Sequence, residues 1–265
     1  MDDSVILQRD GAVATVILNR PDKLNSFTTG MTSALSEIFS ALERDASCRA
    51  ILLTGAGRAF CAGQDLSERT VAPGGAAPRV DVGASIEQRF NPLIRRLRAL
   101  PKPIVVAVNG VAAGAGANLA LQGDIVLAAK SAKFIQSFVK IGLLPDCGGT
   151  WSLTHLLGEA RAKALAMLAE PVSAEQAAQW GMIWKAVDDA ELIGEANKLA
   201  AHLAAQPTQA LAAIKKASHF AATATMDASL DHERDAQREL GYSDDFAEGV
   251  AAFIGKRAPV FTGKA

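Results

Sequence analysis

The first part of the chain alternates between apolar runs and segments with helical spacing. Residues 48–55 (CRAILLTG) and 102–110 (KPIVVAVNG) are apolar almost throughout and end at glycine, which is typical of buried strands. Residues 5–21 predict two strands around the turn at Asp10–Gly11, stopped by Pro21. Residues 28–47 predict a helix with one buried face, because apolar side chains recur three or four positions apart: Met31, Leu35, Ile38, Phe39 and Leu42.

The middle of the chain repeats this alternation, and the end does not. We predict helices at 86–100, 114–124 (after an initial turn), 150–158, 159–168 and 173–181, and strands at 125–137 and 183–189. Beyond residue 190 the pattern is Ala-rich helix: 191–206, 207–222 and 227–256. The chain is therefore expected to be α/β, with a core of residues 1–195 and a C-terminal helical region of residues 196–265. The small apolar residues of that region suit helix packing, including packing between subunits.

Composition excludes several classes of function. The 265 residues carry a net charge of -1, so neither nucleic acid nor an anionic membrane is an expected partner. Three cysteines and four histidines show no disulfide framework and no metal-ligand spacing. The N-terminus lacks a basic region and a long apolar stretch, and we expect reduced thiols and a cytoplasmic setting. Residues 70–84, rich in Pro, Gly and Ala, predict a mobile surface loop for which a role as a lid is one option.

Two glycine-rich turns are the first candidates for chemistry. Residues 60–66 (FCAGQDL) follow a strand, and residues 111–121 (VAAGAGANLAL) follow a strand and open a helix. Glycine lets a backbone approach a ligand closely, and the first N–H groups of a helix have no partner inside the helix. Brought together, the two turns could direct two N–H groups at one developing oxyanion. The alternative is that the glycines serve only to turn the chain.

A single acid, Asp146, stands in the stretch FVKIGLLPDCGGTW (138–151). One reading makes it the N-cap of the following helix, where it would accept a backbone N–H. The other makes it an acid/base group whose ionisation responds both to the helix N-terminus and to apolar neighbours. The adjacent Cys147 has no histidine close in sequence to activate it, so we favour a small packing residue over a nucleophile.

Together, four motifs resemble the crotonase, or enoyl-CoA hydratase/isomerase, family over essentially the whole chain. They are NRPDKLNSF (19–27), GRAFCAGQDL (57–66), KPIVVAVNGVAAGAGANLAL (102–121) and IGLLPDCGGTW (141–151). The resemblance implies a spiral of ββα turns with a C-terminal helical region, assembled as homotrimers or homohexamers. It also implies an acyl-CoA substrate whose thioester oxygen is held by two backbone N–H groups. Carried onto this chain, those donors are Gln64 and Ala115.

Departures from the family pattern point away from hydration. Hydratases of the family carry two glutamates, and the corresponding positions here are Asn118 and Phe138. Neither side chain can activate water or supply a proton near neutral pH. Isomerases of the family often place one acid in the turn that holds Asp146, and a 1,3-proton shift can use one carboxylate as base and then as acid. The apolar Phe138 suits a ring substrate, with ordinary core packing as the alternative.

The pattern is most similar to the branch of the family that converts ring-1,2-epoxyphenylacetyl-CoA to oxepin-CoA in bacterial phenylacetate degradation and can shift 3-enoyl-CoA to 2-enoyl-CoA. The resemblance implies CoA contacts at Ala62, Asp65 and Leu66, and at Phe261 and Lys264 near the C-terminus. Lys264 could equally be a solvated charge. No cofactor is expected beyond the CoA of the substrate. The alternatives are a hydratase or another crotonase-type enzyme, and a non-catalytic acyl-CoA-binding protein.

Overall fold

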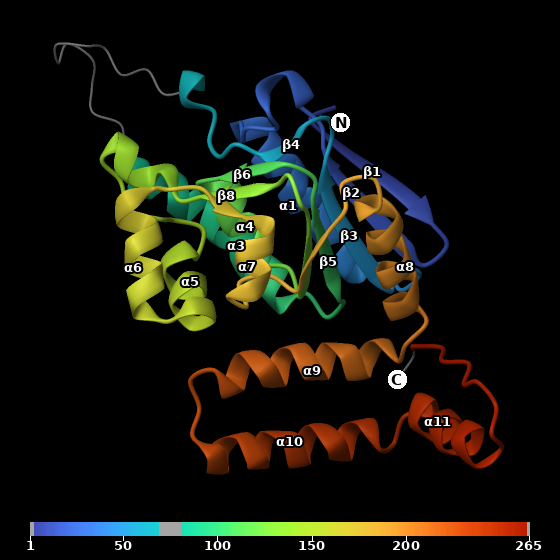
Figure 1. Ribbon diagram of the computed structural model, residues 1–265. Coiled ribbons are helices and arrows are strands. Elements are labelled where there is room, and N and C mark those ends of the chain that lie inside the picture. The colour runs from blue at the N-terminus through green and yellow to red at the C-terminus, as the bar shows by residue number, and fades with distance from the viewer. Residues whose placement is uncertain (1–2, 69–80, 264–265) are drawn as a thin grey trace, which may run out of the picture.

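Two β-sheets organise the computed structural model, which describes residues 3–68 and 81–263 (Figure 1). The strands are β1 (Val5–Asp10), β2 (Val13–Leu18), β3 (Ala50–Gly55), β4 (Ala59–Cys61), β5 (Ile104–Val108), β6 (Val111–Ala113), β7 (Ile125–Ala129), β8 (Lys133–Ile135), β9 (Val172–Ser173) and β10 (Lys185–Val187). The α-helices are α1 (Thr29–Arg44), α2 (Val82–Ser85), α3 (Asn91–Ala99), α4 (Ala115–Ala120), α5 (Gly149–Leu157), α6 (Glu159–Leu168), α7 (Ala174–Gln179), α8 (Leu192–Ala204), α9 (Thr208–Ala221), α10 (Met226–Leu240) and α11 (Asp244–Ile254). Short 3-10 turns lie at Pro21–Lys23, Leu66–Glu68 and Ser137–Ile141, and a π turn at Ile86–Phe90 precedes α3.

The strand order shows a spiral. The larger sheet runs β1-β2-β3-β5-β7-β10 and the smaller one β4-β6-β8-β9. Each of β3, β5 and β7 in the larger sheet is followed in sequence by a short strand of the smaller sheet: β4, β6 and β8. These three short strands are parallel neighbours, so their carboxyl ends meet at one edge. The expected α/β spiral with C-terminal helices is therefore confirmed.

Most predicted elements are confirmed, with a few differences. β1 and β2 pair in antiparallel register, with Val5 opposite Leu18 and Asp10 opposite Val13. The segment 125–137 holds two strands rather than one, and 227–256 is divided into two helices, with Ser243 capping the second through Phe246 N. The short strands β4, β6 and β9 were not predicted, because two or three residues carry no readable alternation.

The expected loop at 70–84 is partly wrong. Residues 82–84 belong to the short helix α2, because the Asp81 side chain caps it by accepting the Ala84 N–H at 2.9 Å. Residues 69–80 lie outside the described part of the chain, so the lid stays a prediction.

The core fills the space around the larger sheet. All five residues of β5 are at most 1% exposed, and α8 packs on β3 and β5. One face of α1 is fully buried, and Thr28 caps the helix by accepting the Met31 N–H at 3.1 Å. Helices α9 and α10 lie next to each other below this core in Figure 1, with α11 beyond them. None of the described helices is long and apolar enough to cross a membrane.

Arg49, just before β3, ties the C-terminal helices to the core. Its guanidinium donates to Thr208 Oγ1 (3.1 Å), to Phe261 O (2.8 Å) and to Gln206 O (2.7 Å). A second link is the buried Lys215 of α9, which forms an ion pair with Asp124 at 3.0 Å. These contacts fix where the helical region leaves the core.

Candidate active site

Three segments meet at the carboxyl-end edge of β4, β6 and β8. They are residues 62–66 after β4, residues 114–117 after β6, and residues 136–149, which follow β8 and lead to α5. The strand register brings these segments together, since Cys61 of β4 pairs with Ala112 of β6, and Ala113 of β6 pairs with Ile135 of β8. The fold therefore gathers both glycine-rich turns and the segment that carries Asp146 at one place.

Residues 62–66, called the Gln64 turn below, lie directly against the turn that opens α4. Gly63 has a φ of +94°, and a Cβ placed on it would lie 3.0 Å from Ala113 O and 3.7 Å from Ala115 N. Phe27 pairs with this turn in parallel, since its N–H donates to Gly63 O at 2.8 Å and its carbonyl accepts from Asp65 N at 2.9 Å. Because successive N–H groups of an extended chain alternate sides, the Gln64 N–H points away from Phe27.

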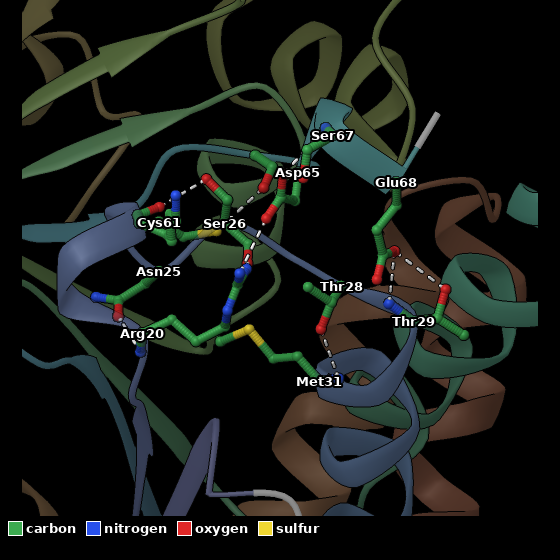
Figure 2. Close-up of polar contacts among 12 residues, drawn as sticks. Arg20, Asn25, Ser26, Thr28, Thr29, Met31, Cys61, Asp65, Ser67 and Glu68 are labelled. Atoms are coloured by element: carbon green, nitrogen blue, oxygen red, sulfur yellow. Dashed lines mark hydrogen bonds and ion pairs between the residues drawn. The ribbon is translucent and has the colours of Figure 1, made fainter. Parts of the chain in front are cut away.

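Arg20 of the segment 19–27 holds the Gln64 turn, and the N–H of Thr29 in α1 holds Glu68 just after it (Figure 2). Arg20 forms an ion pair with Asp65 at 2.9 Å, and the other oxygen of Asp65 accepts from Ser67 Oγ at 2.7 Å. Glu68 accepts from the N–H of Thr29 at 2.9 Å. The Ser67 hydrogen bond and then the Arg20 guanidinium hold the pKa of Asp65 below its ordinary value.

Ala115 is the first residue of α4 and is 3% exposed. The preceding Gly114 has a φ of +52°, a conformation that favours glycine. Gly116 lets the helix contact β4, because a Cβ there would lie 2.3 Å from Cys61 O. The N–H groups of the first helical turn have no acceptor four residues earlier within α4, so the Ala115 N–H is geometrically suited to a ligand oxygen.

Asp146 does not cap α5. That helix begins at Gly149, its N-cap is Gly148, and no side chain caps it. Asp146 is half-buried, its Oδ1 atom is shielded from solvent, and its carbonyl oxygen accepts from Asn118 Nδ2 of α4 at 2.8 Å. The interpretation as an N-cap is therefore wrong, and the acid lies beside the helix that starts at Ala115.

Cys147 is a buried thiol. Burial first, and then the neighbouring Asp146 carboxylate, raise the pKa of Cys147 well above its ordinary value. A thiol in such surroundings is a poor nucleophile, which supports a packing role. All three cysteines are free and buried.

The two positions at which the family resemblance implies glutamates lie in this site. Asn118 is fully buried, and both ends of its amide are engaged within the protein, since Oδ1 accepts from Gln136 Nε2 at 2.9 Å. Phe138 is 6% exposed, and its ring lies 3.7 Å from where a Cβ on Gly114 would stand. Neither position offers a carboxylate to activate water.

The expected CoA contacts have different surroundings. The N–H groups of Ala62 and Asp65 donate to Leu24 O and Phe27 O at 2.9 Å each, and Leu66 is 49% exposed. Phe261 packs against Gly249 of α11. Helix α11 lies at the end of the molecule away from β4 and β6 (Figure 1). Lys264 lies outside the described residues.

Several supporting residues were not found from the sequence. Arg20 and Asn25 lie within the motif NRPDKLNSF, and the Asn25 side chain donates to Ala59 O at 2.8 Å and accepts from Arg20 N at 2.8 Å. Gln122 and Gln136 carry no local signal for the contacts that matter here, because Cys147, Ser152 and Asn118, which accept from them across the site, lie 25, 30 and 18 residues away in sequence. Among the described residues, no cluster of three side chains could hold a metal ion.

A family model described as "Enoyl-CoA hydratase/isomerase" matches residues 8–264. The chain belongs to the enoyl-CoA hydratase/isomerase family. Among its relatives within the family, the "1,2-epoxyphenylacetyl-CoA isomerase" of Escherichia coli (strain K12) is 56% identical over 264 residues, and the match covers 100% of each chain. A Rhodobacter capsulatus protein named "Probable enoyl-CoA hydratase" is 46% identical over 253 residues, 95% of each chain. The solved enoyl-CoA hydratase of Bacillus anthracis has a TM-score of 0.92 at 29% identity and covers 98% of this chain and 100% of its own.

Proposed function

We propose that this member of the enoyl-CoA hydratase/isomerase family is an acyl-CoA isomerase. Its reaction is the conversion of ring-1,2-epoxyphenylacetyl-CoA to oxepin-CoA, and it can also shift 3-enoyl-CoA to 2-enoyl-CoA. Full-length similarity to the E. coli isomerase supports the substrate. The proposed reaction uses groups of the protein and the CoA thioester of the substrate, and no further cofactor.

One observation about the site carries the proposal. Asp146 supplies a carboxylate beside α4, whereas Asn118 and Phe138 stand where hydratases carry two glutamates. Hydration needs groups that position and deprotonate water and also deliver a proton. A 1,3-proton shift needs one group that takes a proton and returns it, and Asp146 suffices for that.

In this mechanism the Gln64 and Ala115 N–H groups hold the thioester oxygen. Asp146 removes a proton from the carbon next to the thioester carbonyl, and the electron pair moves onto the carbonyl oxygen to form an enolate. For 3-enoyl-CoA the enolate collapses and the protonated Asp146 returns the proton at the γ carbon. For the epoxide, the ring C–C bond shared with the oxirane breaks while both C–O bonds stay, which expands the ring to the oxepin, and the protonated Asp146 returns the proton to a ring carbon. Removing one oxyanion donor of this kind costs about a hundred- to a thousandfold in rate.

Product analysis with both substrates, run in parallel for the wild type and Asp146→Asn, tests this function. We expect the wild type to produce oxepin-CoA and 2-enoyl-CoA. The variant should bind CoA esters as before, yet turn over about a hundred- to ten-thousandfold more slowly, because it lacks the proton-transferring group. Unchanged turnover by the variant would remove Asp146 from the mechanism. Binding without any turnover by the wild type would favour a non-catalytic acyl-CoA-binding protein.

A hydratase is the second candidate, and the name of the Rhodobacter relative favours it. Crotonyl-CoA distinguishes the two functions, since hydration removes the absorbance of the conjugated enoyl thioester. We expect that absorbance to stay constant on mixing with the protein. Rapid loss would show that water is activated without the two glutamates.

We further propose a homotrimer or homohexamer built through the C-terminal helices. The expected division at residues 195 and 196 falls inside α8, and the helices that leave the core begin after it. Large apolar side chains are more than half exposed on and around these helices: Ile214, Met226, Leu230, Tyr242, Phe246, Phe253, Ile254 and Val260. A neighbouring subunit would cover them and could bring Phe261 and Lys264 to its partner's CoA. The oligomeric state of the wild type and of Phe253→Asp, measured by sedimentation, tests this assembly. A cytoplasmic location stays a prediction.

A further inference from the structure

The orientation of the Asn118 amide follows from its partners. The carbonyl oxygen of Asp146 can only accept, so Asn118 must present Nδ2 to it, at 2.8 Å. Asn118 Oδ1 therefore faces Gln136, which must present Nε2, at 2.9 Å. The result is a directed chain from Gln136 through Asn118 to the peptide of Asp146.

The backbone of the Asp146 turn, defined as residues 145–149, is strained. Cys147 has a φ of +52° and Gly148 a φ of +75°, so two successive residues adopt the left-handed conformation. A non-glycine residue in this region costs free energy and persists only where its surroundings fix it. Here Asp146 O accepts from both Asn118 Nδ2 and Gly149 N, each at 2.8 Å, and Gln122 Nε2 reaches Cys147 O at 3.2 Å. Asn118 of α4 and Gln122, two residues after that helix, therefore hold the turn.

Close packing defines which side chain fits at position 118. A Cβ on Gly149 would lie 2.1 Å from Asn118 Nδ2, so the amide lies flat against the backbone of Gly149. Asn118 is fully buried, and Gln136 is 4% exposed. An ionised carboxylate at this position would place an acceptor against the acceptor Asp146 O and would lose the bond.

We infer that Asn118, oriented by Gln136, is a positioning residue that sets the place of Asp146 relative to the N–H groups of Gln64 and Ala115. It acts through the peptide of Asp146 and touches no reacting atom in this role. The inference rests on the proposed function of Asp146 as the acid/base. Under this inference, residue 118 positions Asp146 and does not transfer a proton.

Steady-state kinetics of Asn118→Leu and Gln136→Met with 3-enoyl-CoA test the inference. Leu keeps the approximate shape but cannot donate to Asp146 O, and a misplacement of about 1 Å can cost about a hundredfold in rate. We expect kcat to fall about a hundredfold for Asn118→Leu and about tenfold for Gln136→Met, with KM within about threefold of the wild type. Gln136→Met also tests the inference if Asn118→Leu fails to fold.

Two further variants separate positioning from general loss of packing. Thr54→Val removes the buried hydroxyl that donates to Ala107 O at 2.8 Å between β3 and β5, a bond that touches no residue of the Asp146 turn or of its supports, and its kcat should stay within about threefold of the wild type. Asn118→Asp should recover kcat relative to the wild type as pH falls, because a protonated carboxyl can again donate to Asp146 O.

Two outcomes would overturn the inference. One is a wild-type kcat for Asn118→Leu in a preparation where Asp146→Asn is inactive, which would leave the proposed function intact. The other is an Asn118→Asp variant whose relative kcat does not rise on acidification. If Asp146→Asn is itself fully active, the proposed function fails first.

Discussion

The Gln64 turn and the Asp146 turn are fixed by different chemistry. Around the Gln64 turn the supports are charged and partly open to water, since the side chains of Arg20 and Asp65 are 21% and 14% exposed. Around the Asp146 turn they are neutral amides, and Asn118, Gln122 and Gln136 are all at most 4% exposed. The position of Asp146 therefore does not depend on the ionisation of the side chains that hold its turn. The position of the Gln64 N–H, in contrast, depends on the ionised Arg20 and Asp65.

Gly116→Ala should have the largest effect, because it separates α4 from β4 and disturbs both turns. The new Cβ would lie 2.3 Å from Cys61 O and 2.7 Å from Cys61 Cβ, and backbone cannot move aside cheaply. We expect the free energy of unfolding to fall by about 3 kcal/mol, the upper end for overpacking, with loss of most activity. Urea unfolding and kcat measure the two effects.

Gly194→Ala in α8 is the matched control, since nothing lies within 4 Å of the added Cβ. It should raise the free energy of unfolding by up to about 1 kcal/mol, because alanine favours the helix. Equal destabilisation by both substitutions would show that the contact between Gly116 and Cys61 is unimportant.

Arg20→Met should affect the Gln64 turn alone. The variant loses the ion pair with Asp65 and a hydrogen bond to Ser26 O at 2.5 Å. We expect kcat to fall about tenfold, since the Gln64 N–H is less well placed, with no change at the Asp146 turn. Arg234→Met, which breaks an exposed pair with Asp235 on α10, should leave kcat unchanged. A fall of much more than about a thousandfold for Arg20→Met, beyond the cost of one lost oxyanion donor, would mean that the two turns are not independent.

The pH dependence of stability should show the smallest effect. The pKa of Asp65 is lowered in the folded protein, so its contribution is present above its unfolded pKa of about 4 and is lost as pH falls through the folded pKa. Ser67→Ala removes the hydroxyl of Ser67, the largest cause of the shift, and should move this acid loss to slightly higher pH. Urea midpoints between about pH 2 and pH 6 measure it. An unchanged profile would argue against this account of Asp65.

Much of the fold followed from hydrophobic pattern, and part of the site did not. Buried strands such as β5 and one-sided helices such as α1 are long enough for their periodicity to be read. The smaller sheet has strands of two or three residues, and its meeting edge depends on tertiary register. The role of Asp146 as a cap could be rejected only when α5 was seen to begin at Gly149. The supports at Gln122 and Gln136 depend on partners distant in sequence, which no local pattern reveals.

Hydrogen exchange at the carbon next to the thioester tests the central claim most directly. Phenylacetyl-CoA, which cannot isomerise, is incubated in D₂O with the wild type or with Asp146→Asn, and deuterium uptake is followed by mass spectrometry at saturating ligand. We expect the wild type to exchange the α protons and the variant to do so at least about a hundredfold more slowly, at equal affinity for the CoA ester. Exchange at the wild-type rate in the variant would contradict a mechanism in which Asp146 carries the proton.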